Sequence, residues 1–356
     1  MSTAFDSADD SFQIRIVGNG VATACCSRLL ADAGLRTQHD RASRPHLAAV
    51  LLGVQTQGLL HDVFHNSEIF SGCHPIKRRT VLWGVGGEPI TMPHQGLVTA
   101  EGPLLERLWQ AIPHQEASFD TSAPHFSIFT STASANEATP LKSIAIGQRS
   151  ASVTRVRLRP EADPHACAIE STSLGWLFLL PISLTHASLI VVSNGAIVDD
   201  QLDESRLIVR AIERTSIEST YRSFASAPRL HTPLCTETQL RCGSAAMTFD
   251  PVCGEGVGHS IREAFLASAL VRSLCDGEPA IDLFAHYETR LHLGFIRHLE
   301  LCRNFYTNGG ISAFWTSELA QLEHGITAMR NQLTTYPPPR YLLSSTRLVR
   351  IEDTPR

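Results

Sequence analysis

Apolar residues near the start of the chain recur first with the period of a strand and then with that of a helix. Residues 12–17 predict a short buried strand that stops at Gly18. Residues 21–33 have helical spacing, with Gly34 as the expected C-terminal stop, and residues 35–40 predict a second strand. We therefore expect a βαβ unit with two parallel strands at the N-terminus.

The middle of the chain is richer in strand patterns. Residues 45–65 and 103–111 predict helices, whereas residues 66–95 predict short antiparallel strands. Between residues 125 and 195, several runs rich in β-branched residues follow one another with evenly spaced turns. Such runs predict an antiparallel sheet.

The last third of the chain returns to helical patterns. A helix is expected from Asp203 to about Phe224, and residues 282–333 predict two helices separated by a turn at residues 308–310. This order predicts an α/β nucleotide-binding domain interrupted by an antiparallel substrate domain, with a helical C-terminus. The expected boundaries are 12–65, 96–115, 140–152 and 236–281 for the nucleotide-binding domain, 66–95 and 153–235 for the substrate domain, and 282–345 for the C-terminal helices.

Composition narrows the class of protein. The chain has 356 residues, of which 43% are apolar, so a large core is possible. Its net charge of −5 argues against nucleic acid or an anionic membrane surface as a partner. The nine cysteines form no CxxC pair, and we expect reduced thiols in a cytoplasmic protein. The polar N-terminus predicts no secretory signal, and the apolar run 174–184 is too short to cross a bilayer.

The functional signal comes from two glycine clusters, and the first contains Gly18 and Gly20. Gly18 allows a tight turn after the strand, and Gly20 lets a phosphate group approach the backbone at a helix N-terminus. Thr23 stands where a dinucleotide-binding fingerprint has a third glycine, so we expect a slightly wider spacing between helix and strand. The acid that would bind the ribose is expected at Asp40, although the commonest spacing falls on Arg41. A plain strand–turn–helix connection is the alternative.

The second cluster contains Gly254, Gly256 and Gly258, directly before an amphipathic helix. Its helix start is again bare backbone, which can bind an anionic or electron-rich group. Two bare helix starts at opposite ends of one chain fit one long ligand with two distant anchor points. A dinucleotide that carries an isoalloxazine ring is such a ligand.

The segment 243–264, GSAAMTFDPVCGEGVGHSIREA, resembles the late flavin motif of the glutathione-reductase-like FAD enzymes. This superfamily includes class A monooxygenases, geranylgeranyl reductases and flavin-dependent halogenases. Ser244 stands where the family has an aspartate that contacts the ribityl and phosphate region. Residues 143–153, with Gly147, resemble a family strand that passes close to the cofactor, and residues 168–182 resemble the strand that crosses above the flavin. The late motif also resembles that of the flavoproteins that hydroxylate a tryptophan in a partner protein during tryptophylquinone formation.

The resemblance implies an FAD-dependent oxidoreductase, with a glutathione-reductase-type domain for FAD. The favoured activity is that of a monooxygenase, whose flavin hydroperoxide hydroxylates a small aromatic substrate or a partner protein or peptide. The alternatives are a halogenase, a reductase, or a non-catalytic maturation protein that binds a partner. Phe178 departs from the halogenase pattern WxWxIP and favours oxygenation. Because no second dinucleotide motif is present, the electrons are expected from NAD(P)H that binds transiently or from a flavin reductase.

The two clusters and the resemblance together predict a set of site residues. The expected cofactor-binding residues are Gly18, Gly20, Thr23, Asp40, Arg41, Gly147, Ser244, Asp250, Pro251, Gly254, Gly256, Val257 and Gly258. Trp176 and Phe178 are expected to shield the flavin ring, with ordinary core packing as the alternative. His259, at the second helix start, is expected to be neutral near pH 7 and is a candidate general base; a surface or packing histidine is the alternative. The sixteen histidines show no zinc-type spacing, so no metal site is predicted.

Overall fold

A five-stranded sheet forms one end of the fold. The structure is a computed structural model that describes residues 13–41, 45–113, 125–132, 141–217 and 222–351, so Phe12 at the start of the predicted strand lies outside the described residues. β1 (Gln13–Val17) lies between β2 (Thr37–Asp40) and β6 (His125–Phe129), and both neighbours are parallel to it. β15 (Gln239–Arg241) extends the parallel set, and β14 (Cys235–Thr236) is an antiparallel edge strand. The predicted βαβ unit is confirmed.

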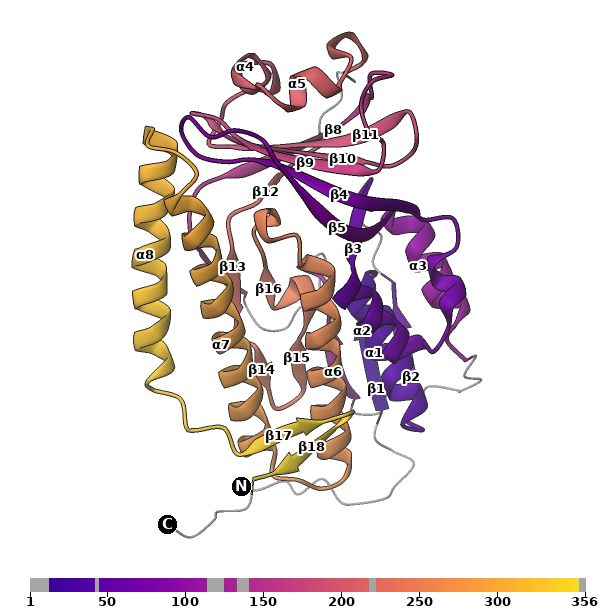
Figure 1. The fold of residues 1–356 in the computed structure, drawn as a ribbon. Coiled ribbons are helices and arrows are strands. Elements are labelled where there is room, and N and C mark those ends of the chain that lie inside the picture. The colour runs from indigo at the N-terminus through magenta and orange to yellow at the C-terminus, as the bar shows by residue number, and fades with distance from the viewer. Residues whose placement is uncertain (1–12, 42–44, 114–124, 133–140, 218–221, 352–356) are drawn as a thin grey trace.

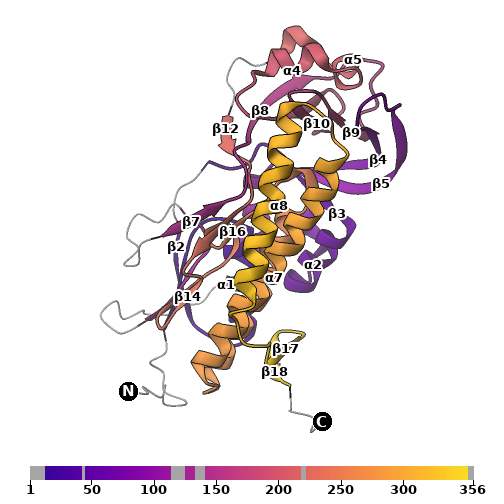
Figure 2. The same cartoon turned by 90° about the vertical axis from the view of Figure 1, so that its left-hand side faces the viewer.

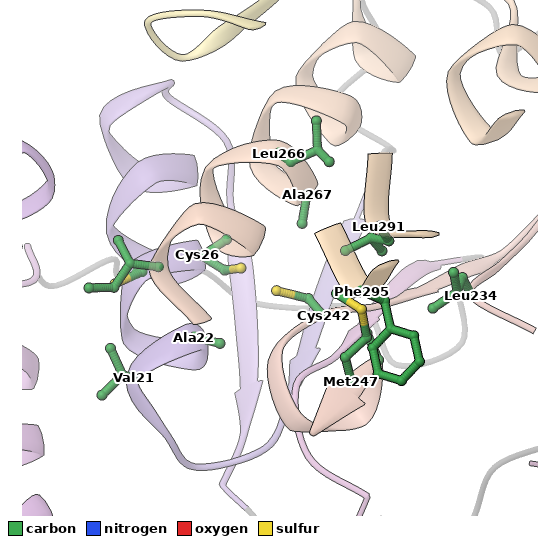
Figure 3. Packing of buried hydrophobic residues seen from close by; sticks show 14 of the residues in the cluster. Val21, Ala22, Cys26, Leu234, Cys242, Met247, Leu266, Ala267, Leu291 and Phe295 are labelled. Atoms are coloured by element: carbon green, nitrogen blue, oxygen red, sulfur yellow. The ribbon is translucent and has the colours of Figure 1, made fainter. Parts of the chain in front are cut away.

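The two helices that begin at the glycine clusters pack side by side. α1 (Val21–Asp32) follows β1 and ends before Gly34, whose φ of 77° is the left-handed conformation expected after a helix. α6 (Gly256–Cys275) lies next to it, as Figure 3 shows. Small side chains such as Ala22 and Ala267 are buried here and allow the helices to approach closely. The distant glycine clusters are thereby brought to neighbouring helix starts.

The second sheet has eight strands and lies at the opposite end of the molecule (Figures 1 and 2). Its order is β12 (Arg222–Ala225), β8 (Ser150–Arg157), β11 (His186–Ser193), β10 (Gly175–Pro181), β9 (Ala166–Ser171), β4 (His74–Leu82), β5 (Ile90–Thr99) and β3 (Val50–Gly53). Neighbouring strands are antiparallel, as predicted, except that β4 and β9 run parallel. The sheet is therefore mixed rather than purely antiparallel.

Strand β10 shows why this sheet has two different faces. Leu177 and Leu179 point to one face, where they share a core with α4 (Val198–Glu204) and α5 (Ile208–Ala211). Trp176 and Phe178 alternate with them and point to the other face, toward the rest of the protein. β10 therefore buries apolar side chains on both of its faces.

A small third sheet connects the two larger ones. It consists of β16 (Met247–Thr248), β13 (Arg229–Thr232) and β7 (Lys142–Ala145), all antiparallel. Two short 3₁₀ turns, η3 (Gly243–Ala245) and η4 (Pro251–Cys253), flank β16 and lead into α6. This segment carries the sequence of the second glycine cluster to its helix.

Two long antiparallel helices run along one side of the molecule (Figures 1 and 2). α7 (Ala280–Thr307) and α8 (Ala313–Leu333) are joined by the Asn308-Gly309-Gly310 turn, which confirms the predicted pair. After them, β17 (Tyr341–Ser344) and β18 (Arg347–Arg350) form a hairpin that contacts α6. No helix among the described residues combines the length and the apolar character needed to cross a bilayer.

Three assignments from the sequence were wrong in part. Residues 45–65 begin with strand β3, because Val50 and Leu52 alternate into the core, and the helix α2 spans only Val54–Phe64. The run at 125–129 is β6, which belongs to the parallel sheet rather than to the antiparallel one. Its four buried side chains suit a strand covered on both faces.

The expected helix from Asp203 to Phe224 is also wrong. α4 ends at Glu204, α5 has only four residues, and η2 (Arg214–Ser216) follows; Phe224 lies in strand β12. Leu202, Ile208 and Ile212 each bury their side chain on the eight-stranded sheet, and this repeated docking breaks the segment into short pieces. The remaining helical elements are α3 (Glu101–Gln110), which was predicted, and η1 (Ser67–Phe70).

Candidate cofactor site between the two sheets

A pocket of about 380 Å³ is lined by strands of the eight-stranded sheet and, opposite them, by residues that follow β1 and β6 of the five-stranded sheet. Gly20 at the start of α1 and Gly256 at the start of α6 both line it. Phe178, Leu180 and Ile190 of the eight-stranded sheet form an apolar wall. The two helix starts therefore face one continuous space, which is what a single long ligand with two anchor points requires.

The first helix start is shaped by close packing beneath the pocket. A Cβ at Gly18, where φ is 141°, would overlap the Thr130 hydroxyl. Thr23 is fully buried; its Oγ1 accepts the Gly20 N–H at 3.0 Å and lies 2.7 Å from Thr130 Oγ1. Gly18 and Thr23 do not line the pocket, whereas Gly20, Val21 and Ala22 do. Gly18 and Thr23 thus support the turn that presents Gly20.

Ser244 joins the second cluster to this turn. Its hydroxyl donates to the carbonyl oxygen of Thr130 at 3.2 Å, and both residues line the pocket. Gly243 has a left-handed φ of 58°, and its N–H donates to the buried Glu263 carboxyl at 2.7 Å. Burial raises the pKa of Glu263, against the opposing effect of that hydrogen bond. Thr130, which the sequence patterns do not single out, is the point where both clusters meet.

The two ribose candidates lie outside this pocket. Asp40 pairs with Arg15, whose Nε donates to Asp40 Oδ2 at 2.7 Å on the exposed edge of the sheet. The Arg41 guanidinium lies over the ring of Trp109, 3.9 Å from its centroid. Arg41 and Trp109 line a separate small cavity of about 160 Å³ beside α1. The structure therefore places both residues beyond the α1 end of the main pocket.

The loop before α6 forms the opposite wall. Pro251, Gly254, Gly256 and Val257 line the pocket. A Cβ at Gly254 or Gly256 would meet no heavy atom within 4 Å, so the missing side chains leave open space. Gly258 is different, because a Cβ there would lie 3.1 Å from Thr56 Oγ1 of α2. Gly258 allows two helices to pack closely and does not line the pocket.

Asp250 lines the pocket and is anchored in a buried ionic network. The Arg149 Nε donates to Asp250 Oδ2 at 2.6 Å, and Arg149 Nη1 lies 2.5 Å from Glu318 Oε2. Tyr306 Oη donates to the same Asp250 oxygen at 2.9 Å, while the N–H of Val252 donates to Oδ1 at 2.8 Å. Burial opposes the charge of Arg149, but its anionic neighbours outweigh this and raise its pKa. The network fixes the carboxylate and the turn that follows it.

His259 lies behind this wall rather than on it. Its ring stacks on Phe249, with centroids 4.0 Å apart, and Phe249 itself lines the pocket. Burial, with help from Arg262, lowers the pKa of His259 to about 4, although Glu255 acts in the opposite direction. The imidazole is therefore neutral at pH 7, as expected. It lines a larger cleft of about 830 Å³ between α2, α6 and α7, which neither glycine cluster reaches.

Of the three remaining candidates, one lines the pocket and two do not. Phe178 lines the pocket, whereas Trp176 is 1% exposed and its Nε1 donates to Tyr306 Oη at 3.1 Å. Gly147 has a φ of 103°, and a Cβ there would overlap Glu318 and Arg149. Gly147 and Trp176 therefore adjoin the ionic network and do not face the pocket.

No model of a known protein family matches the sequence, and no curated protein matches it either. Solved structures do match. The chain is 19% identical to the peptidyl tryptophan dihydroxylase QhpG, with a TM-score of 0.66 over 86% of this chain and 78% of that one. It is 15% identical to the myxobacterial chondrochloren halogenase CndH, with a TM-score of 0.71 over 91% and 90% of the two chains. HpxO of Klebsiella pneumoniae, solved in complex with FAD, matches at 11% identity and a TM-score of 0.63 over 92% and 99%.

The chain has the fold of the FAD-dependent halogenases and hydroxylases. This halogenase–hydroxylase fold is a mixed α/β fold, and its helical C-terminus is the part that carries Tyr306 and Glu318. Both residues were missed from the sequence, because they lie far along the chain from the loop they support. Arg149 falls within the segment whose resemblance to the family was noted, but no feature of the sequence marks it as buried.

Arg79 also lines the pocket, although it was not among the site residues predicted from the sequence. Residues 77–79 form a basic run in β4, and such runs usually lie on a solvated strand edge. Arg78 is indeed largely exposed and pairs with Asp163, but Arg79 is half-buried and lines the pocket. Arg79 Nη2 lies 3.1 Å from His94 Nε2. It brings a positive charge to the apolar wall.

One side-chain group behind the pocket has the composition of a metal site. The ligand atoms of Cys253, His298 and Cys302 lie within 4.8 Å of one another. The spacing along the sequence does not reveal this group. However, His298 Nε2 already accepts the N–H of Asp250 at 2.9 Å and faces Cys302 Sγ at 3.3 Å. A cation bound by Nε2 would have to displace the Asp250 N–H, because this nitrogen has one lone pair.

Proposed function

We propose that this protein is an FAD-dependent monooxygenase that acts on an aromatic substrate, either a small molecule or a side chain of a partner protein. The observation that supports this best is the single pocket that joins the start of α1 to the start of α6. Two helix N-termini offer backbone N–H groups and positive dipole ends at separate points of one ligand. Among the solved structures with this fold, QhpG is by its name a peptidyl tryptophan dihydroxylase, and HpxO was solved in complex with FAD.

The residues of the pocket fit FAD. The backbone at Gly20, Val21 and Ala22 would receive the pyrophosphate, and the open space at Gly254 and Gly256 would receive the flavin ring. The adenosine end would then extend past α1 toward Asp40. Arg15 engages only Oδ2 of this residue, so Oδ1 is left to accept a ribose hydroxyl. We also propose that the chain divides, as the sequence predicts, into an FAD-binding domain, a substrate domain and C-terminal helices. We further propose that the protein is cytoplasmic.

The protein's own contribution is binding, orientation and exclusion of water. Bound FAD supplies the redox chemistry and the reaction with oxygen. Phe178, Leu180 and Ile190 present an apolar surface that removes water from the reacting edge of the ring. The N-terminal N–H groups of α6 would stabilise negative charge on a bound flavin ring. Neutral His259 is not in the pocket, so any proton it takes must pass Phe249 or enter from the larger cleft.

The substrate would lie against the eight-stranded sheet. This wall combines the apolar side chains with the cation of Arg79, which suits an aromatic ring that carries or develops negative charge. The electrons would come from NAD(P)H that binds transiently or from a separate flavin reductase. A halogenase with the same fold is distinguished by a requirement for halide in product formation.

FAD binding is the first test. The purified protein should be yellow, or should bind added FAD with a change in the flavin spectrum. Gly256→Val places a branched side chain in the open space at the start of α6 and should weaken FAD binding at least tenfold, a change of about 1.4 kcal/mol. Gly58→Val is the matched control, because Gly58 is exposed on α2 and does not line the pocket. A colourless protein that rejects FAD would overturn the proposal.

A further inference from the structure

We propose that Tyr306, Trp315 and Trp83 form an aromatic relay that carries single electrons between the molecular surface and the cofactor pocket. The proposal rests on the proposed function, because FAD is the redox group at the inner end. Of the protein's four tryptophans, Trp176 and Trp315 contact Tyr306 directly, and Trp83 contacts Trp315.

The inner end of the relay touches the wall of the pocket. Tyr306 is fully buried and donates its phenolic proton to Asp250 Oδ2 at 2.9 Å, and Asp250 lines the pocket. Trp176 donates its indole N–H to the same phenolic oxygen at 3.1 Å. A tyrosine loses an electron readily only when its proton can leave at the same time, since the oxidised phenol is a strong acid. A carboxylate within hydrogen-bond distance provides that acceptor.

The outer part of the relay consists of two indole rings. The ring centroids of Tyr306 and Trp315 are 5.3 Å apart, and those of Trp315 and Trp83 are 5.5 Å apart. Trp315 is 1% exposed, whereas Trp83 is partly exposed. Rings in van der Waals contact exchange electrons quickly. The relay therefore has a buried middle and an end that a reductant in solution can reach.

The loops around the relay are shaped to hold these indoles. A Cβ at Gly309 or at Gly310 would overlap the ring of Trp315, so the turn between α7 and α8 lies flat on that ring. The Trp315 Nε1 donates to the carbonyl oxygen of Thr172 at 2.8 Å, and the Trp83 Nε1 donates to that of Phe305 at 3.0 Å. A carbonyl dipole at each N–H stabilises the positive charge that an oxidised indole carries. The relay thereby explains the two glycines of this turn, which the proposed function alone does not explain.

The electron balance is closed by one oxidant and one reductant. Tyr306 would give one electron to flavin that is bound in the pocket and excited by blue light, and its phenolic proton would move to Asp250. Tyr306 regains an electron from Trp315 and its proton from Asp250, and Trp315 takes an electron from Trp83. Ascorbate restores Trp83 by giving it one electron, and ascorbate releases one proton to the solution. The net change is one electron from ascorbate to the flavin.

A buried aromatic cluster of this kind also packs the top of the α7–α8 pair, and the test must separate the two roles. Phenylalanine keeps an aromatic ring in place but is far harder to oxidise than tryptophan or tyrosine. Trp83→Phe and Trp315→Phe therefore interrupt the relay while they preserve most of the packing. Tyr336→Phe is the control, because Tyr336 lies beyond the opposite end of α8 and contacts His292.

The experiment is anaerobic photoreduction of the FAD-loaded protein in ascorbate, followed by the loss of the flavin absorption. A laser flash without ascorbate should produce the absorption of a tryptophan radical. We expect Trp83→Phe and Trp315→Phe to slow photoreduction severalfold and to shorten the radical signal, and Tyr336→Phe to behave like the wild type.

Equal rates in all FAD-loaded proteins, with no tryptophan radical, would overturn the relay and leave the proposed function intact. A protein that binds no FAD would overturn both proposals. If Trp315→Phe does not fold, Trp83→Phe still decides the outcome, because Trp83 is partly exposed and its replacement disturbs less of the core.

Discussion

The two helix starts that face the pocket are supported in opposite ways. At α1, the turn is held by neutral hydrogen bonds: Thr23 accepts the Gly20 N–H and lies against the hydroxyl of Thr130. At α6, the preceding turn is held by charge: buried Arg149 pairs with Asp250 and with Glu318 of the C-terminal helices. The α1 start is therefore supported by uncharged groups, and the α6 start by charges that the C-terminal helices help to supply.

This difference teaches what the helical C-terminus contributes. α7 and α8 do not line the pocket within the described residues, yet they supply Tyr306 and Glu318 to the network around Asp250. A buried arginine is costly unless its charge is matched by anions in good geometry. The C-terminal helices provide that match, so the loop at Asp250 can be rigid only when they are docked. The α1 start needs no such support.

The largest expected effect is that of breaking the charged support. Arg149→Met leaves two carboxylates buried without their cation and should lower the free energy of unfolding by about 3–5 kcal/mol, measured by urea denaturation. The matched control is Arg15→Met, which breaks the exposed Arg15–Asp40 pair in the first half of the site. That change should cost about 0–1 kcal/mol. Similar losses in the two variants would contradict the comparison.

A smaller effect is expected from pH. His259 behind the α6 start has a pKa of about 4 when folded, against an ordinary value of 6.5. The unfolded chain therefore binds a proton that the folded chain rejects, and stability falls as the pH decreases from about 6.5 to about 4. Allowing for partial exposure, this histidine should contribute about 2 kcal/mol to that loss. Urea denaturation at both pH values should show a smaller loss in His259→Gln. An equal loss in the variant and the wild type would refute the assignment.

The same difference between the two helix starts determines how much of the site could be predicted from the sequence. The α1 start, with Gly18, Gly20 and its βαβ context, follows from spacing over a few residues, and the glycines before α6 follow from a motif. The network does not, because Arg149, Asp250 and Glu318 meet only through tertiary folding. The spacing of residues along a strand also does not show which of them line a pocket. Trp176 and Phe178 are two residues apart on the same face of one strand, yet only Phe178 lines the pocket.

The smallest effect is expected at the neutral support. Thr23→Val keeps the shape of the side chain but removes the hydroxyl that accepts the Gly20 N–H and meets Thr130 Oγ1. A buried donor left without a partner should cost about 1 kcal/mol in the free energy of unfolding. Because the freed N–H belongs to the turn that faces the pocket, FAD affinity should fall as well. Thr23→Ser retains the hydroxyl and should keep the FAD affinity of the wild type. If Thr23→Val and Thr23→Ser bind FAD equally well, the hydrogen bonds of Thr23 do not support the α1 start.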